Sequence, residues 1–253
     1  MNRHLTILLL GTLLAAACVV YNVQADRPET KTWPASAITA IDVRADNGAI
    51  TVRATADTLV TATVTKSCKG TSHADAEAHL ADITAGDSIA GTTLYLWGRA
   101  PTPNSRSYNT QYAITAPAAC RLYVETANGA VNLDSMAGAA VVVAANGAVG
   151  TVAHSASISV EAANGAINCD AAGLATGDSA TLHSSNGRVT LYLPAATSLA
   201  FDIITSNGNA TVDGFANVSY TREEARHKTG TIGTGVAAAA LRSENGNVII
   251  EAK

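Results

Sequence analysis

Two aspartates have the residue type and spacing that hydrolytic chemistry could use. Asp134 and Asp170 lie 36 residues apart, twice an 18-residue step that recurs in this part of the chain. If each step is one coil of a solenoid, the two carboxylates align two strands apart, at roughly 9 to 10 Å. Glycosidases use paired carboxylates at comparable separations. Small acidic residues at solvated corners also explain both positions, and aromatic sugar platforms are scarce in the repeats, so we expect no catalytic residue.

The histidines and cysteines do not form a metal-binding pattern. His73 and His79 are six residues apart, on different faces of the helix expected there, and His154, His183 and His227 lie on separate units. No Cys-x-x-Cys pair or Cys/His cluster occurs. The sequence carries no nucleophile-elbow, phosphate-loop or zinc-protease motif. It therefore predicts neither a metal ion nor a cofactor.

The N-terminus predicts export. Basic Arg3 and His4 precede an apolar run from Leu5 to Val20, and the stretch ending at Ala25 fits small-residue signal cleavage, giving a signal peptide of residues 1–25. The alternative is a lipoprotein signal of residues 1–17, because the stretch ending at Cys18 (AAAC) resembles a lipobox. In that case the protein attaches to a membrane only through a lipid anchor at Cys18. Either signal places the mature protein in the periplasm, at the outer membrane or on the cell surface.

Three further cysteines would enter an oxidising compartment. Cys68 and Cys120 flank strand-like runs and are the candidate disulfide. Cys169 falls on the apolar phase of its repeat, which predicts a buried thiol.

The low charge of the chain excludes nucleic-acid binding by the repeats. Charged residues make up 14% of the chain, against about 25% in ordinary soluble domains. The segment between Leu122 and Gly214 contains seven acidic residues and only one basic residue, Arg188. A nucleic-acid interface requires clustered Lys and Arg, so we expect no nucleic-acid partner.

An Asn-Gly dipeptide between strand-like runs recurs seven times. Asn and Gly supply the positive φ values that a tight reversal needs, so each dipeptide predicts a turn or corner. The predicted structural corners are Asn47-Gly48, Asn128-Gly129, Asn146-Gly147, Asn164-Gly165, Asn186-Gly187, Asn207-Gly208 and Asn245-Gly246.

Two architectures fit these units. Counting outward from each dipeptide places the apolar residues on one face, so that Val124, Val142 and Val160 are equivalent. A row of stacked β-hairpins satisfies this parity, and so does a solenoid whose strands pair with those of the next coil. A step of 18 residues that grows to 21 or 22 without loss of phase favours coils. We therefore expect an all-β, single-stranded β-solenoid (β-helix-like) of 18–22-residue coils, with an Asn side-chain ladder along one corner.

The rest of the chain adds a few elements to the solenoid of residues 40–253. Residues 26–39 form an extended lead-in. Ser72 caps a single short helix in the segment SHADAEAHLADI. The polar segment Thr221–Lys228 predicts a loop or short helix, which could face a partner. Strands are predicted at Leu59–Lys66, Thr92–Trp97 and Tyr108–Ala116.

These features together resemble a known family. The repeated (T/A/S)-x-NG-x-(I/V)-x-(V/L) phrase, the single helix, the stretch YAITAPAACRLYVETANGAV and the closing KTGTIGTGVAAAALRSENGNVII resemble the bacterial putative-adhesin family, whose members are domains of unknown function related to head GIN domains. The resemblance covers about Ala40 to Glu251 and implies an exported β-solenoid-like protein with no catalytic residues. This chain departs from the family pattern at Ala130, Ala148 and Ala166, where an acidic residue commonly follows the Gly.

We therefore expect an exported, non-enzymatic cell-envelope protein, an adhesin or a surface or periplasmic scaffold. Its partner would be an envelope protein or a polysaccharide. Two other classes stay open: a polysaccharide-acting β-helix enzyme, and a regulatory or structural envelope factor that binds another protein.

Overall fold

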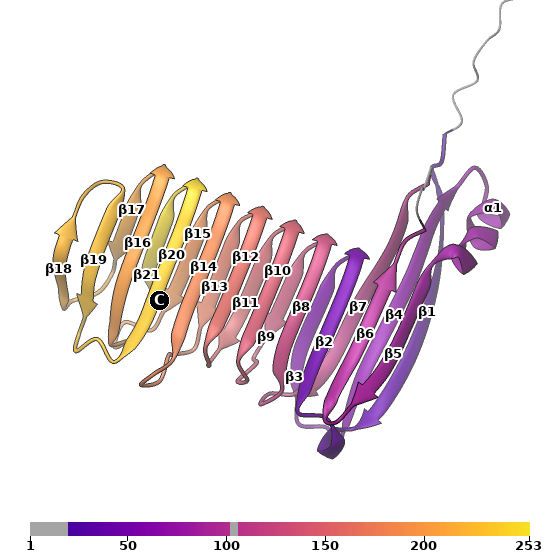
Figure 1. Ribbon diagram of the computed structural model, residues 1–253, viewed down its shortest axis with the longest axis horizontal. Coiled ribbons are helices and arrows are strands. Elements are labelled where there is room, and N and C mark those ends of the chain that lie inside the picture. The colour runs from indigo at the N-terminus through magenta and orange to yellow at the C-terminus, as the bar shows by residue number, and fades with distance from the viewer. Residues whose placement is uncertain (1–19, 102–105) are drawn as a thin grey trace, which may run out of the picture.

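The computed structural model describes residues 20–101 and 106–253, so Cys18 and most of the predicted signal lie outside the described residues. Two large β-sheets face each other and enclose one elongated core (Figure 1). The all-β prediction is confirmed.

The strands of both sheets lie side by side in an order that differs from the order of the chain. From one edge to the other, sheet A contains β1 (Val23–Pro34), β4 (Leu59–Gly70), β7 (Tyr108–Pro117), β3 (Ile50–Thr55), β9 (Val131–Asp134), β11 (Val149–His154), β13 (Ile167–Ala171), β15 (Val189–Leu193), β21 (Val248–Ala252) and β17 (Ala210–Asp213). Sheet B contains β18 (Val218–Glu223), β19 (His227–Ile232), β16 (Leu199–Asn207), β20 (Ala237–Asn245), β14 (Ser179–Asn186), β12 (Ile158–Asn164), β10 (Ala140–Asn146), β8 (Arg121–Asn128), β2 (Ala40–Asn47), β6 (Thr93–Arg99) and β5 (Thr84–Ala90).

The strands pair between coils, as a solenoid requires. In each Asn-Gly unit a strand of sheet B ends at the Asn, and a strand of sheet A begins three residues later. The strands of neighbouring coils run parallel and in register, so Val142 lies between Val124 and Val160. The solenoid prediction is confirmed, and the hairpin alternative is wrong for these units.

The order of the coils differs from the order of the chain at both ends. The last unit, β20/β21, is inserted between β14/β15 and β16/β17. At the other end β6/β7, which lacks an Asn-Gly corner, stacks outside the first unit β2/β3. The chain thus inserts one coil near its C-terminal end and adds one outside its first unit at the other end.

The seven corner asparagines form an unbroken amide ladder. Each side-chain Nδ2 donates to the Oδ1 of the preceding Asn in the stack, at 2.7 to 2.9 Å. The spatial order is Asn47, Asn128, Asn146, Asn164, Asn186, Asn245 and Asn207. Each inner rung both donates and accepts, so the ladder links all seven units.

The corner glycines are required mainly because neighbouring backbones approach closely. A Cβ added to Gly165 would lie 2.0 Å from the carbonyl oxygen of Gly147, and one on Gly129 would lie 2.1 Å from that of Gly48. Among the seven corners, only Gly48 and Gly147 have φ in the left-handed region, at +135° and +152°. None of the corner asparagines has positive φ. The predicted reason, positive φ throughout, is therefore wrong for most corners.

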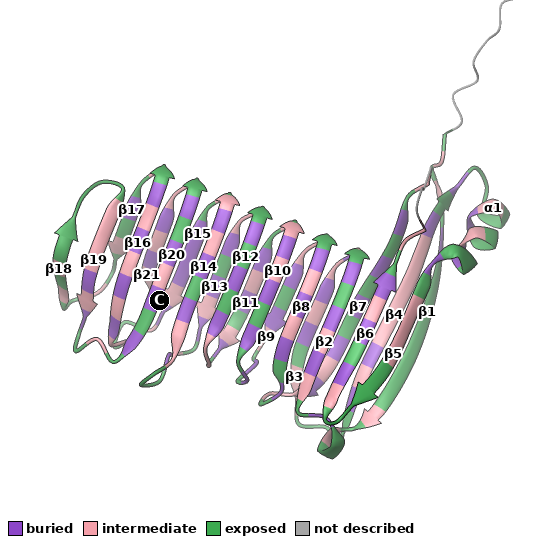
Figure 2. Cartoon of the chain, in the orientation of Figure 1, coloured by how far each residue is buried: buried purple, intermediate pink, exposed green. Residues whose placement is uncertain are grey.

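Alternation along the strands builds the core. Inward residues are buried and outward residues are mostly half-buried or exposed, which appears as bands along each strand in Figure 2. Fully buried examples are Val124, Val142, Leu182 and Leu191. Burial of each such side chain contributes about 1.5 to 3 kcal/mol to the free energy of folding. The core therefore holds neighbouring coils together.

Antiparallel strands cover the N-terminal end. The predicted lead-in is strand β1, which pairs with β4, and β4 pairs with β7. Helix α1 (His73–Ala78) begins after Ser72, whose Oγ accepts from the Asp75 amide at 3.1 Å, and continues as a 3₁₀ turn at His79–Asp82. The helix covers a second, smaller cluster that includes Ala25, Cys68 and Leu80. A short 3₁₀ turn at Ala35–Ala37 links β1 to β2.

A hairpin covers the C-terminal end. The segment predicted as a loop or short helix, Thr221–Lys228, instead spans the end of β18, a turn and the start of β19. β19 pairs antiparallel with both β16 and β18. The backbone pairing of β18 and β19 therefore extends sheet B at this end.

Candidate recognition surfaces

The two aspartates with the spacing of a catalytic pair are each held in an ion pair. Asp134 accepts from Arg53 Nε at 2.8 Å, because the two residues are in register on β9 and β3. Asp170 pairs with Lys253 near the end of the chain. Each carboxylate is therefore already engaged by a cation from another strand or from the end of the chain.

The histidines remain apart. Among the described residues no cluster of three or more His, Cys, Asp or Glu side chains could hold a metal ion. His79 Nδ1 contacts the Asp75 carbonyl oxygen at 2.7 Å, within the short helix. His73 lies 3.8 Å from Glu77, four residues along the same segment.

Of the histidines that the structure describes, His154 alone is buried. A β-bulge after Thr151, with Ala153 at φ +52°, shifts the alternation of β11 and turns His154 inward. The side chain is fully buried, and neither ring nitrogen has a hydrogen-bond partner among the described residues. Burial lowers the pKa of His154 below 6.5, because the charged imidazolium is poorly solvated there. The neutral ring is therefore a structural group sensitive to acid.

His227 belongs to a polar network on the C-terminal hairpin. Its Nε2 lies 2.9 Å from Asp202 Oδ1 on β16, and its Nδ1 lies 2.6 Å from Arg222 on β18. Arg222 donates through Nη1, so Nδ1 accepts and Nε2 carries the proton that it donates to Asp202. This network ties the hairpin to the solenoid. His183 lies on β14, in register with Arg242 of β20.

The cysteines are all free thiols in the described part of the chain. Cys120 lies in the main core, where its Sγ donates to the Ile38 carbonyl oxygen at 3.5 Å. Cys68 lies in the second cluster under the helix, so the predicted Cys68–Cys120 disulfide is not formed. Cys169 is fully buried, as predicted, and burial raises the pKa of its thiol to about 11.

A salt bridge anchors the helix beside the N-terminal strand. Arg106 donates to both carboxylate oxygens of Asp75, at 2.7 and 3.1 Å, and its guanidinium lies 4.6 Å from the centre of the Tyr21 ring. The hydrogen bonds from Arg106 hold the pKa of Asp75 well below its usual range. The site is structural, since its groups satisfy one another.

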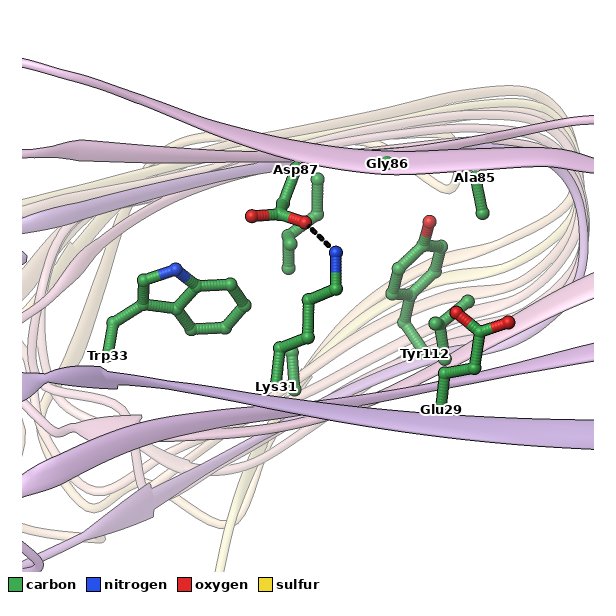
Figure 3. A pocket seen from close by; sticks show the side chains of 10 residues that line it. Glu29, Lys31, Trp33, Ala85, Gly86, Asp87 and Tyr112 are labelled. Carbon is green, nitrogen blue, oxygen red and sulfur yellow. Dashed lines mark hydrogen bonds and ion pairs between the residues drawn. The ribbon is translucent and has the colours of Figure 1, made fainter.

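A narrow pocket opens between the two sheets at the N-terminal end. Figure 3 shows Lys31 of β1 reaching across to Asp87 of β5, with the Trp33 ring on one side and Tyr112 on the other. The Tyr112 hydroxyl is buried and has no hydrogen-bond partner among the described residues. The space available to water-sized molecules is about 20 Å³, enough for one water. The sequence does not predict this pocket, because β1 and β5 meet only through the sheet topology.

The residues that line the pocket close the N-terminal end of the solenoid. The Lys31–Asp87 pair bridges the edge strands of the two sheets, and burial keeps the Tyr112 hydroxyl protonated by raising its pKa. Edge strands invite pairing with other chains, and charged residues and proline on an edge oppose it. β1 carries Pro28 and Lys31, so this end is a protected cap.

No helix among residues 20–101 and 106–253 has the length and apolar character that crossing a membrane would demand. A comparison with curated proteins finds no match. The solved structures similar to this chain include two adhesion-related proteins. A putative cell adhesion protein from Clostridium sporogenes is 10% identical, with a TM-score of 0.51 over 90% of this chain and 100% of that one. A putative adhesin from Bacteroides fragilis is 12% identical, with a TM-score of 0.45 over 88% of this chain and 97% of that one.

The first of these similarities supports the fold alone, because the identity is low. The family assignment comes from the sequence: residues 30–251 match the Toastrack DUF4097 model, which covers most of the chain. The chain therefore belongs to the Toastrack DUF4097 family, in agreement with the resemblance found in its Asn-Gly repeats.

Proposed function

We propose that this protein is an exported, non-catalytic component of the cell envelope that acts as an adhesin or scaffold through the outer faces of its solenoid. The observation that supports the proposal is the continuous network of hydrogen bonds that connects the coils. Seven corners are joined by one amide ladder, and parallel strands hold the outward rows of both sheets in register.

A rigid sheet face suits recognition because its side chains are already ordered. Association then costs less conformational entropy than it does for a flexible loop. The ion pairs at Asp134 and Asp170 support the non-catalytic part of the proposal, since each carboxylate already has a cation as its partner.

The test combines adhesion with turnover. Beads coated with the purified domain should retain envelope or extracellular polysaccharides, and the recovered polymer should keep its original length. Asp134→Asn and Asp170→Asn should leave retention unchanged. Turnover that disappears in either variant would establish the enzyme alternative. Retention of no polysaccharide, with one stoichiometric protein crosslinked in cells, would favour the protein-binding envelope factor.

A further inference from the structure

The outer face of sheet B carries an ordered cluster of aromatic and charged side chains at its N-terminal end. Strand β2 lies between β6 and β8, and the three strands are parallel. Their outward residues form two rows in register. One row is Tyr95, Asp42 and Tyr123, and the other is Trp97, Arg44 and Glu125. We call these six residues the aromatic–charged array; it spans two strand spacings, roughly 10 Å.

Arg44 stands at the centre of the array and fixes its neighbours. It donates to both carboxylate oxygens of Asp42, at 2.8 and 2.9 Å, and lies 3.5 Å from Glu125. Its guanidinium stacks 4.7 Å from the centre of the Tyr123 ring, and the Tyr123 hydroxyl donates to Glu125 at 3.1 Å. The hydrogen bonds to Asp42 raise the pKa of Arg44, so the cation is permanent. The polar groups are therefore oriented before any ligand arrives.

The two outer aromatic residues are placed by the neighbouring strands. The Trp97 ring lies over Gly86 of β5, where an added Cβ would come within 2.5 Å of the indole. Tyr95 is 37% exposed, a large fraction for an aromatic residue on a sheet face. Beside Trp97 and Glu125, the small Ala127 leaves a hollow of about 210 Å³ that Asp46 and Arg99 also line. This end of the face thus offers flat apolar rings next to a polar hollow.

We propose that the aromatic–charged array binds a neutral saccharide chain. Rings with exposed faces can pack against the C–H faces of pyranose rings, while Asp42 and Glu125 accept and Arg44 donates hydrogen bonds to sugar hydroxyls. Binding sites of this kind combine apolar surface with a few well-oriented polar groups. The proposal rests on the adhesive function above and names its ligand class and its site.

Charge selects a neutral saccharide over an acidic one. The array and hollow contain three carboxylates (Asp42, Asp46, Glu125) and two guanidinium groups (Arg44, Arg99), a balance of −1. Arg44 is already engaged by Asp42 and Glu125. A uronic-acid chain would place further carboxylates beside this negative site, which costs free energy.

The two tryptophans of the chain provide a direct readout. They are Trp33, in the end pocket, and Trp97, in the array. In a Trp33→Phe background, Trp97 is the sole source of tryptophan fluorescence. The experiment titrates this variant with soluble neutral β-glucan and xylan oligosaccharides, and in parallel with polygalacturonate oligomers. We expect a saturable change in Trp97 emission with the neutral chains and none with the acidic ones.

Substitutions then assign the binding to the array, with affinity measured by calorimetry. Tyr95→Ala and Trp97→Ala should each weaken binding by about tenfold or more, as expected for aromatic anchors. Trp97→Tyr should retain most of the affinity. Glu125→Gln keeps the shape of the side chain and should still weaken binding. Tyr192→Ala, on the outer face of sheet A, is the matched control and should have no effect. Unchanged urea midpoints show that the variants fold.

Several results would overturn the proposal. The proposal is wrong if no neutral oligosaccharide binds, or if acidic chains bind equally well. It is also wrong if the Trp97→Ala variant keeps full affinity, or if the array binds only a polypeptide. Adhesion by the coated beads distinguishes this failure from failure of the proposed function. If Trp97→Ala beads adhere normally, the adhesive function stands and the array is not its site.

Discussion

Replacing Gly165 with alanine tests whether close approach of the backbones, rather than positive φ, determines the corner residue. The new Cβ would lie 2.0 Å from the Gly147 carbonyl oxygen, although ordinary contacts begin at 3.4 Å. The two coils must therefore separate locally by more than 1 Å. This movement breaks the hydrogen bond from the Gly147 amide to the Asn164 carbonyl, now 3.0 Å, and the ladder bond from Asn164 to Asn146, now 2.9 Å.

The cost follows from those two bonds. Each contributes about 1 kcal/mol net, and a donor left without a partner adds about 1 to 3 kcal/mol. We expect Gly165→Ala to lower the free energy of unfolding by about 3 to 5 kcal/mol, which for a chain of this size lowers Tm by roughly 10 °C.

Gly91→Ala is the matched control. Gly91 has φ +61° and no atom within 4 Å of an added Cβ, so alanine there meets only the backbone penalty of about 1 kcal/mol. Urea unfolding of both variants measures the difference. A Gly91→Ala variant as destabilised as Gly165→Ala, or more so, would refute the close-approach reasoning.

The remaining predictions concern the ladder, the buried histidine and the thiols. Asn146→Ala removes two amide bonds of the ladder and Asn207→Ala removes one, so by urea unfolding the inner variant should lose about 1 kcal/mol more. The folded-state pKa of His154 is below its unfolded value of 6.5, so its stabilising contribution is complete above that pH and declines as the pH falls. His154→Leu should therefore show a smaller loss of stability than the wild type between about pH 7 and about pH 5; equal slopes would contradict this. Three thiols should resist a thiol reagent in the folded protein and react after unfolding, because all are buried: Cys68, Cys120 and Cys169. Mass spectrometry of the labelled protein counts them, and fast labelling without denaturant would contradict their placement.

The corners could be predicted from the sequence because each one repeats the same local requirement. Asn128, Asn146 and Asn164 recur at an 18-residue step, and the alternation around them fixes which side chains face inward. The sequence could not predict why each corner needs glycine. The requirement comes from the close approach of two neighbouring coils, whereas a local sequence pattern indicates only the φ value within one coil.

The order of the coils was not predictable for a related reason. Every unit carries the same phrase, so the unit at Asn245 matches the neighbours of Asn186 and Asn207 equally well. The sequence pattern does not say that it inserts between them. The Cys68–Cys120 prediction failed similarly, since the local pattern around each cysteine does not show that the fold places the two in different buried clusters.

The aromatic–charged array could not be predicted because its members come from distant segments. Tyr95 and Trp97 lie outside the repeats, and only the pairing of β6 and β8 with β2 places them in the same rows as Tyr123 and Glu125. The scarcity of aromatic residues within the repeats therefore gave a misleading view of the face.

The central claim is that this solenoid binds saccharide chains without cleaving them. The most direct measurement incubates the purified domain with a neutral oligosaccharide of defined length, follows Trp97 emission in the Trp33→Phe background, and determines the length of the recovered chain by mass spectrometry. We predict saturable binding and a recovered chain of unchanged length. Shortened chains that disappear with Asp134→Asn or Asp170→Asn would contradict the account.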